Sequence, residues 1–189
     1  MPRLEAFYLD HPDVAVNVAT TPHEVPRLGP GIDIAMRYGD GNWHDGTVDL
    51  LFRETVEPVC APSYVTRLHD RTGDLGSAFL IHVDTNDRRW ITWPDYLART
   101  GQKAAGSAKG LRFSNYVQAT QAALSGHGVM LGWRSISGDH IEKGTLVPAG
   151  LPALHPNNAY HAVLSHRSRN LATAEVVVAW LKGAAAGVG

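Results

Sequence analysis

LRFSNYVQATQAALSGHGVML, residues 111–131, is the stretch that decides the fold class. Its first three residues predict a short strand, and Ser114 or Asn115 can cap a helix that follows directly. The helix continues to about Ser125, and Gly126 suits the position just past its end, where a left-handed backbone is needed. Residues 129–131 predict a second strand. Strand, helix and strand in this order are typical of an α/β fold.

The rest of the chain continues the alternation of short strands and amphipathic helices. His11-Pro12 ends the first predicted helix, and Val14, Val16 and Val18 alternate with smaller or polar residues as in a strand. Two lobes joined by extended crossovers near residues 55–61 and 145–150 would explain the pattern. Helices are expected at residues 4–8, 93–100, 136–141 and 172–182, and strands or extended segments at 14–18, 32–36, 50–60, 78–83 and 160–164.

The composition is that of a globular chain with no general affinity for nucleic acid. Apolar residues make up 44% of the 189 residues and charged residues 19%, and 17 Lys and Arg oppose 18 Asp and Glu. Proteins that bind nucleic acid through its phosphates show a basic excess, which a net charge of −1 does not provide. The chain by itself is therefore not expected to bind DNA.

The cysteine content and the first residues bear on the compartment. Cys60 is the single cysteine, so no internal disulfide can form, which fits a reducing environment. Residues 1–5 lack the apolar core of a signal peptide, and no uncharged stretch reaches the ~18 apolar residues of a membrane helix. We expect a soluble, cytoplasmic protein.

Five motifs in chain order resemble the effector-binding domain of LysR-type transcriptional regulators. Pro2–Phe7, followed by residues 11–14, resembles the first helix and next strand of that domain, and Gly31–Gly39 resembles its "GvDlAiRyG" strand. Trp90 and Trp93 are similar to paired aromatics in the branch that includes glycine-cleavage and β-lactamase regulators. The remaining three motifs are Glu54 with Pro58–Pro62 ("E…PVCSP"), Gln121–Val129 ("qAAlaGqGVal") and Gly144–Val147 ("GrLV").

The resemblance implies two Rossmann-like lobes joined by a two-strand hinge, as in type 2 periplasmic binding proteins. Lobe I would comprise residues 1–58 and 147–189, and lobe II residues 59–146. A small, anionic effector would bind between the lobes and modulate transcription, without a cofactor. The domain would form homodimers or tetramers, with the helix at residues 4–8 of one chain against the helix at 117–124 of another.

Two parts of the family pattern are missing from these residues. One is the N-terminal winged helix-turn-helix, through which such a regulator would contact DNA. The other is the first strand of lobe I, whose loss would leave unpaired backbone groups in the sheet. Either the fold tolerates this loss poorly, or another segment fills the place.

The predicted helix at residue 115 supplies the main candidate for binding an anion. Free N–H groups at a helix N-terminus favour a carboxylate, and Ser114 and Asn115 lie at its mouth. The alternative is that both residues only cap the helix. Asp84 and Trp133 each follow a predicted strand of the same lobe, so either can reach a ligand there. Trp90 and Trp93 are expected to be packing anchors.

Lobe I offers candidates at the ends of its strands. Thr20 and Thr21 end the predicted 14–18 strand, and Tyr160 begins the last strand. Arg37 can clamp a carboxylate in a bidentate pair, with Tyr38 beside it. The alternatives are a strand-end turn for the threonines and a structural ion pair with a neighbouring Asp for the arginine.

Metal binding and catalysis have weak support in the sequence. His155, His161 and His166 are the closest group of histidines, and their spacing matches no zinc motif. Ser125 lacks the glycine two residues earlier that a nucleophile elbow needs. We expect no metal and no enzyme. The alternatives are a stand-alone solute-binding protein of the same fold and a serine hydrolase using Ser125.

Overall fold

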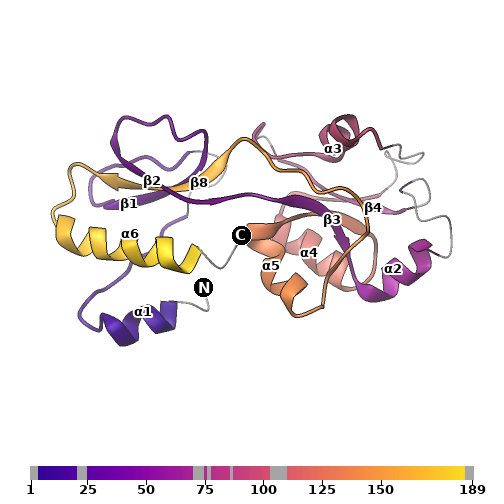
Figure 1. Ribbon diagram of the computed structural model, residues 1–189, viewed down its shortest axis with the longest axis horizontal. Helices are drawn as coiled ribbons and strands as arrows, with labels where there is room; N and C mark the ends of the chain where they lie inside the picture. Colours follow the sequence, from indigo (N-terminus) through magenta and orange to yellow (C-terminus); the bar gives the residue numbers. More distant parts are fainter. Residues whose placement is uncertain are drawn as a thin grey trace. The chain divides into compact units, whose positions relative to one another are not determined.

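The computed structural model describes residues 4–20, 25–69, 75, 78–85, 87–102 and 110–185, and its contacts divide the chain into two compact units. Unit 1 comprises Met1–Arg53 and Asn157–Gly189, and unit 2 comprises Glu54–Pro156. Each unit combines a sheet with helices (Figure 1), which confirms the α/β fold class.

Unit 1 is built on a three-stranded sheet in the order β1-β8-β2. The central strand β8 is antiparallel to both neighbours, and α6 packs on the face that carries Ala162 and Leu164. The ring of Phe7 on α1 is fully buried and lies 5.1 Å from that of Trp180, so α1 packs against α6. The elements are α1 (Leu4–Asp10), β1 (Ile34–Gly39), β2 (Gly46–Arg53), β8 (Ala159–Ser165) and α6 (Leu171–Ala185).

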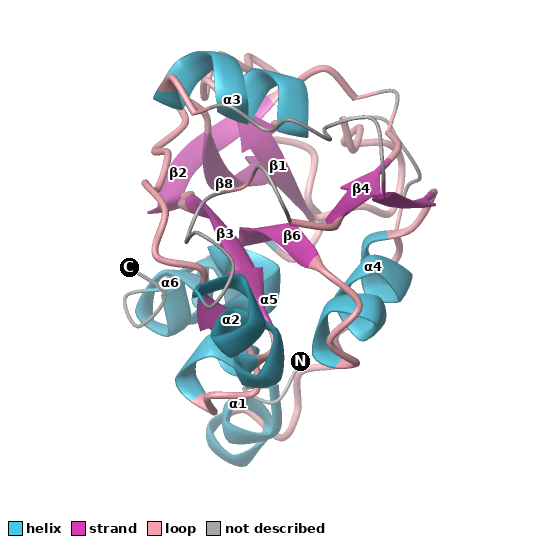
Figure 2. Ribbon diagram, turned by 90° about the vertical axis from the view of Figure 1, so that its right-hand side faces the viewer, coloured by secondary structure: helices cyan, strands magenta, loops and turns pink. Residues whose placement is uncertain are grey.

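Unit 2 contains a five-stranded mixed sheet in the order β5-β4-β6-β3-β7 (Figure 2). β4 runs parallel to β5 and to β6, whereas β3 is antiparallel to β6 and to β7. Its strands are β3 (Val56–Cys60), β4 (Leu80–Val83), β5 (Gly110–Phe113), β6 (Val129–Trp133) and β7 (Val147–Pro148). Its helices are α2 (Pro62–His69), α3 (Trp93–Thr100), α4 (Tyr116–Leu124) and α5 (Arg134–Glu142).

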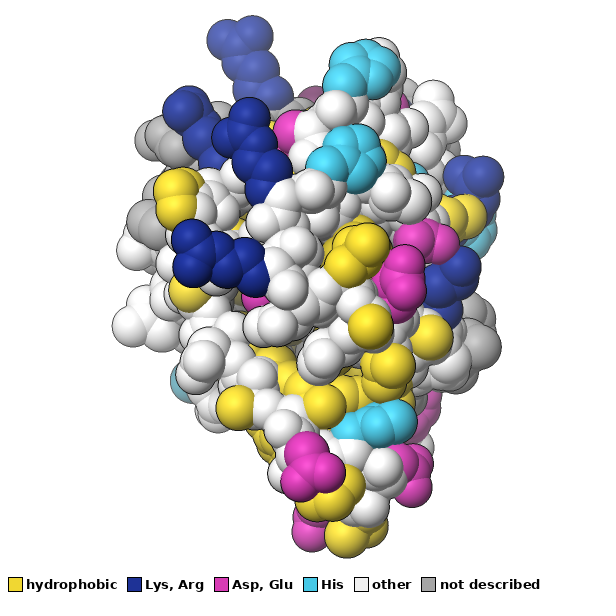
Figure 3. All heavy atoms as spheres, turned by 90° about the vertical axis from the view of Figure 1, so that its left-hand side faces the viewer, with side chains coloured by type: hydrophobic (Ala, Val, Ile, Leu, Met, Phe, Trp, Pro, Cys, Tyr) yellow, Lys and Arg dark blue, Asp and Glu magenta, His cyan; other side chains and the backbone are white. Residues whose placement is uncertain are grey.

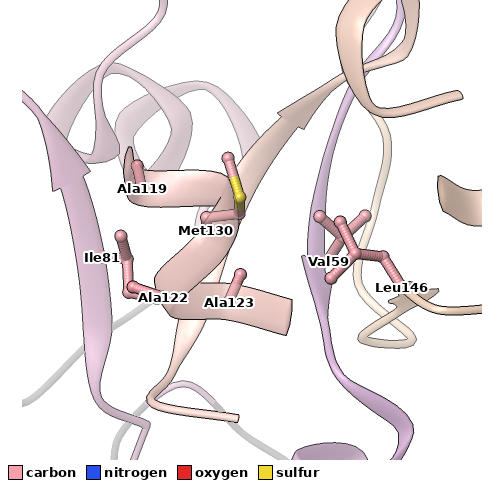
Figure 4. Packing of buried hydrophobic residues seen from close by; sticks show 7 residues of the cluster. All are labelled: Val59, Ile81, Ala119, Ala122, Ala123, Met130 and Leu146. Atoms are coloured by element: carbon pink, nitrogen blue, oxygen red, sulfur yellow. The ribbon is translucent and has the colours of Figure 1, made fainter. Parts of the chain in front are cut away.

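The core of unit 2 lies between α4 and the sheet. Ala119, Ala122 and Ala123 face Ile81 of β4 and Met130 of β6, as Figure 4 shows. Alanine at all three helix positions lets the α4 backbone approach the sheet closely, because no longer side chain holds it away. The N-terminus of α4 is thereby fixed relative to the strands that precede and follow it.

Most predicted elements are present with shifted ends, and α3 is found at the predicted residues. Thr92 and Asp95 cap each other's backbone N–H groups in a capping box, and Gly101 ends the helix with a φ of 67°. Asn115 caps α4, as predicted. Trp93 is 2% exposed and donates its indole N–H to the carbonyl of Ile81 at 2.9 Å, which confirms its role as a packing anchor.

One prediction about the elements was wrong. Residues 14–18 form no strand, because none of the described segments pairs with them. The extended segment expected up to residue 60 ends there as β3, and Pro62 is the first residue of α2, a position where its fixed φ suits a helix and its missing N–H costs nothing. The lobe boundaries expected after residue 58 and before 147 fall within unit 2, whose sheet includes β3 and β7.

Candidate functional site

The candidate site of unit 2 lies at the carboxyl ends of its parallel strands. β4, β5 and β6 point in the same direction, so their carboxyl ends meet at one edge of the sheet. Asp84 directly follows β4, Ser114 follows β5, and Trp133 is the last residue of β6. With Asn115, which follows Ser114, the structure therefore places at one edge the four lobe II positions that the sequence had singled out.

The N-terminus of α4 opens at this edge. The side-chain oxygen of Asn115 accepts a hydrogen bond from the Val117 N–H at 2.8 Å, and its carbonyl accepts one from Ala119. The side chains of Ser114 and Asn115 are both exposed. Asn115 thus uses one acceptor to cap the helix and keeps its amide N–H₂ group for a ligand, so the two proposed roles are compatible.

Charged and titratable groups surround this helix terminus. Arg112 lies 3.3 Å from Asp84, and both side chains are more than half exposed, so the pair is weak and open to exchange. The side chain of His82 on β4 is buried. Burial lowers its pKa, the positive charge of Arg112 lowers the pKa further, and the negative charge of Asp84 acts in the opposite direction. His82 is therefore neutral near about pH 7.

Aromatic rings line the same edge. The ring of Trp90 lies 4.3 Å from that of Trp133 and 5.8 Å from that of Tyr116, the first residue of α4. The Tyr116 hydroxyl accepts the backbone N–H of Trp133 at 2.8 Å. Trp133 itself is 1% exposed, so Trp90 is the more accessible of the two indoles. These rings offer an apolar surface beside a helix N-terminus.

The guanidinium group of Arg37 in unit 1 is already bound by other groups of the protein. Its guanidinium donates to both carboxylate oxygens of Asp45, at 2.6 and 2.7 Å, and to the carbonyl of Pro26 at 2.7 Å. The Arg37 side chain is 3% exposed, and the ion pair lowers the pKa of Asp45 to about 2. This arrangement favours the structural alternative for Arg37 over a role in ligand binding.

The other lobe I candidates divide between the sheet and a segment without strand structure. Tyr38 and Tyr160 are opposite each other on β1 and β8, with ring centroids 5.0 Å apart, and Phe52 of β2 stacks on Tyr160 at 4.9 Å. Thr20 is exposed and lies outside any strand. Thr21 lies outside the described residues. The site roles of all four stay predictions.

Sequence reasoning missed three groups at the unit 2 edge. Arg112 lies between two apolar residues in a strand that leads directly into a helix cap, and this pattern could have indicated that its side chain lies near the helix N-terminus. No local sequence pattern indicates Tyr116 or Trp90, because their contacts with Trp133 join residues that are far apart in the sequence.

The described part of the chain was also compared with the requirements of a metal site and of a membrane-spanning helix. Within it, no three His, Cys, Asp or Glu side chains are grouped so that they could hold a metal ion. Nor does any described helix combine the length and the hydrophobicity needed to span a bilayer. Ser125, the hydrolase candidate, is the C-cap residue of α4.

Comparison with protein families gives a match over nearly the whole chain. The family described as "LysR substrate binding domain" matches residues 1–186. The glycine cleavage system transcriptional activator of Escherichia coli is 29% identical over 188 residues, which cover 98% of this chain and 60% of that protein. The transcriptional activator AmpR of Rhodobacter capsulatus is 32% identical over 146 residues, covering 77% of this chain and 48% of that protein. The chain thus spans about half to three fifths of the length of these curated relatives.

Solved structures give the same fold. The effector domain of AmpR from Pseudomonas aeruginosa matches with a TM-score of 0.75 and 23% identity, over 98% of this chain and 88% of that one. The AmpR effector-binding domain from Citrobacter freundii matches with a TM-score of 0.73 and 22% identity, over 98% and 90% of the two chains.

Proposed function

The chain belongs to the LysR substrate-binding domain family, and on that premise we propose that it binds a small anionic metabolite on behalf of a transcriptional regulator. Its relatives are transcriptional activators, and its fold is that of effector-binding domains. The observation that carries the anionic part of the proposal is the N-terminus of α4, with Ser114 and Asn115 exposed beside the loosely paired Arg112.

These groups suit a carboxylate. The helix N-terminus carries a partial positive charge, the N–H₂ group of Asn115 and the hydroxyl of Ser114 can donate, and Arg112 can exchange Asp84 for a ligand anion. The rings of Trp90 and Tyr116 would take an apolar part of the same ligand. We expect Thr20 and Tyr160 of unit 1 to contribute hydroxyl groups. A ligand shared by the two units, as the sequence predicts, would bias their arrangement by no more than its differential affinity for the two states.

We further propose that two copies associate through α1 and α4. Tyr8 and Leu9 on α1 are 40% and 80% exposed, and Val117 on α4 is 64% exposed. Exposed apolar side chains on two helices are the usual sign of a contact surface when they gather on one face. Val117→Asp should then lower the mass measured by light scattering, whereas an unchanged mass would contradict this interface.

A ligand screen with two matched variants tests the effector proposal. The purified chain is melted in the presence of amino acids, small carboxylates and cell-wall fragments. A ligand at about 100 times its dissociation constant adds about 2.7 kcal/mol to the free energy of unfolding, which raises the melting temperature visibly.

Asn115→Asp keeps an oxygen to cap α4 but adds a negative charge, so carboxylate hits should weaken by about tenfold or more. Asn115→Ser keeps the cap without the charge and serves as the control for folding. Carboxylates that bind the Asp variant as tightly as the original chain would show that the anion does not bind at α4.

A further inference from the structure

His82 has a buried ring nitrogen without a hydrogen-bond partner. The residue is 8% exposed, and its Nε2 bonds to no other described group. Figure 3 shows histidine side chains of the other kind, which stand on the surface where water can bond them. A buried polar atom that makes no hydrogen bond costs free energy, and native structures seldom leave one without a partner. The Nε2 of His82 therefore needs a partner that the described residues do not supply.

The side chain of His82 lies on the face of the sheet opposite α4. Ile81 packs on α4 (Figure 4), and successive side chains of a strand point to opposite faces. Arg112 is the residue of β5 paired with His82, so the two side chains lie side by side on that face. Gly110, two residues earlier in β5, leaves room for the ring, because a Cβ there would lie 3.2 Å from the Cδ2 of His82. The ring thus lies against β5, next to Arg112.

Asp84 completes a group of three side chains on the same face. It follows His82 by two residues, and its backbone N–H continues the β4–β5 ladder by donating to the carbonyl of Phe113. Its carboxylate lies 3.3 Å from Arg112, and the two side chains are 55% and 58% exposed. The ion pair therefore meets solvent, whereas the imidazole beside it is buried.

The elements that pack on β4 bring few other titratable groups. β6 carries none, α4 carries only the phenol of Tyr116, which donates to the carbonyl of Leu131 at 3.3 Å, and β5 carries only Arg112. On α3, the charge of Arg99 acts on the carboxylate of Asp95. These groups leave Arg112 as the one charge that the neighbouring strands and helices place next to His82.

The segment after β4 supplies the remaining charges. Asp87 and Arg89 are hydrogen-bonded to each other, so Asp84 is the carboxylate that acts on His82. Burial lowers the pKa of His82 most, the positive charge of Arg112 lowers it further, and the negative charge of Asp84 raises it. A ligand anion beside Arg112 would act in the same direction as Asp84 and favour the protonated imidazole.

We propose that His82 is a binding residue of the anion site: a carboxylate that replaces Asp84 on Arg112 also accepts a hydrogen bond from the protonated Nε2 of His82, so binding takes up one proton. This proposal rests on the proposed function and adds its dependence on pH. The proton comes from solvent, and neutral imidazole becomes imidazolium. The ligand brings the acceptor that the buried nitrogen lacks, and both cationic groups bind it through charge-assisted hydrogen bonds.

Titration with formate, followed by nuclear magnetic resonance at several pH values, tests the proposal. Formate is the smallest carboxylate and stays ionised from about pH 8 to about pH 5. At constant ionic strength, its affinity should rise at least about fivefold as the pH falls through that range. By reciprocity, added formate should raise the pKa of His82 measured from its ring protons. Formate affinity that stays constant or falls with falling pH would overturn the proposal and leave the anion site in place.

The backbone amide signals of Ser114 and Asn115 report on the anion site itself. At formate concentrations up to about 200 mM, which would detect even a millimolar dissociation constant, both signals should move. Signals that stay fixed at every pH would overturn the anion site, and with it both the proposed function and the role of His82.

Matched variants separate His82 from other titrating groups. His82→Gln keeps a neutral N–H donor but cannot take up a proton, so formate should bind it equally well at both ends of the pH range. His127→Gln is the control, because His127 is exposed and precedes β6 at the opposite end of the sheet, and it should keep the full pH dependence. A pH dependence that survives His82→Gln, or that is lost in His127→Gln, would overturn the role of His82.

Asp84→Asn tests the exchange of one carboxylate for another. The variant removes the group that competes for Arg112, so formate should bind it more tightly than the original chain at every pH. Weaker binding of formate in this variant would contradict the replacement of Asp84 by the ligand.

Discussion

Replacing Glu54 tests how a buried carboxylate stabilises α5. Glu54 is 1% exposed, and its Oε1 accepts the backbone N–H groups of Thr55 at 3.0 Å and of Ser135 at 3.1 Å. Trp133, the N-cap residue of α5, makes no side-chain cap of its own. Glu54 therefore supplies the cap from a distant part of the chain, next to the point where the chain leaves unit 1.

Two substitutions of Glu54 are expected to change the free energy of unfolding by different amounts. Glu54→Ala loses two hydrogen bonds, leaves two buried N–H groups without an acceptor and opens a cavity, for a loss of about 2–4 kcal/mol in the free energy of unfolding. Glu54→Gln keeps an oxygen that both N–H groups can reach, and it removes the negative charge. Its hydrogen bonds are weaker than those of the carboxylate, but a neutral amide costs less free energy to bury than a charged group. We expect the Gln variant to remain within about 1 kcal/mol of the original chain near about pH 7.

The pH dependence has a definite sign. Burial raises the pKa of Glu54 above its ordinary value, against the opposing effect of its hydrogen bonds. Between the unfolded and the folded pKa the folded state binds more protons, so rising pH destabilises it. Urea unfolding followed by circular dichroism should therefore show the original chain losing stability relative to Glu54→Gln as the pH rises from about 4 to about 7. A relative gain over this range, or an Ala variant as stable as the Gln variant, would refute the capping role.

Three further substitutions and one chemical labelling reaction have expected outcomes. A Cβ at Gly110 would lie 1.9 Å from the backbone oxygen of Leu80, so Gly110→Ala should cost about 3 kcal/mol or more in a urea melt. Gly138→Ala, with open space around the new methyl group in α5, should instead gain about 0.5–1 kcal/mol. Thr92→Ala should lose about 1 kcal/mol with the capping box of α3, and an unchanged melt would contradict that cap. Burial raises the pKa of the Cys60 thiol to about 11, so iodoacetamide should label it only after urea unfolding, and rapid labelling of the native chain would contradict its burial.

The predictable parts of this fold are those set by neighbouring residues. Thr92, Asp95 and Gly101 fix both ends of α3 within ten positions, and Asn115 fixes the start of α4 through a bond to Val117. The turns between β5 and α4 place the candidate site of unit 2 in the same local way. Fold class and half of the candidate site follow from such short-range rules.

What could not be predicted depends on partners far away in the sequence. The valines at residues 14–18 have the composition of a strand, but a strand exists only with a neighbour to bond, and no pattern within five residues supplies one. Glu54 lies 81 positions before Ser135, whose N–H it accepts. Its presence in the family motif was visible, but its role as a helix cap required the packing of α5 against the sheet.

The two arginines near the predicted sites show that burial can overturn a binding role that was inferred from the residue type alone. Arg37 has the right chemistry to bind a carboxylate with both terminal nitrogens, and in this protein it binds that of Asp45. The Arg37 side chain is 3% exposed. A ligand would have to replace that carboxylate and leave Asp45 charged beside it. Arg112 makes a longer contact, 3.3 Å, with a partner that is more than half exposed, so water can replace either group at little cost. The weaker ion pair is therefore the better place for an anion to bind, and it lies beside the strand-to-helix turn that the sequence had already indicated.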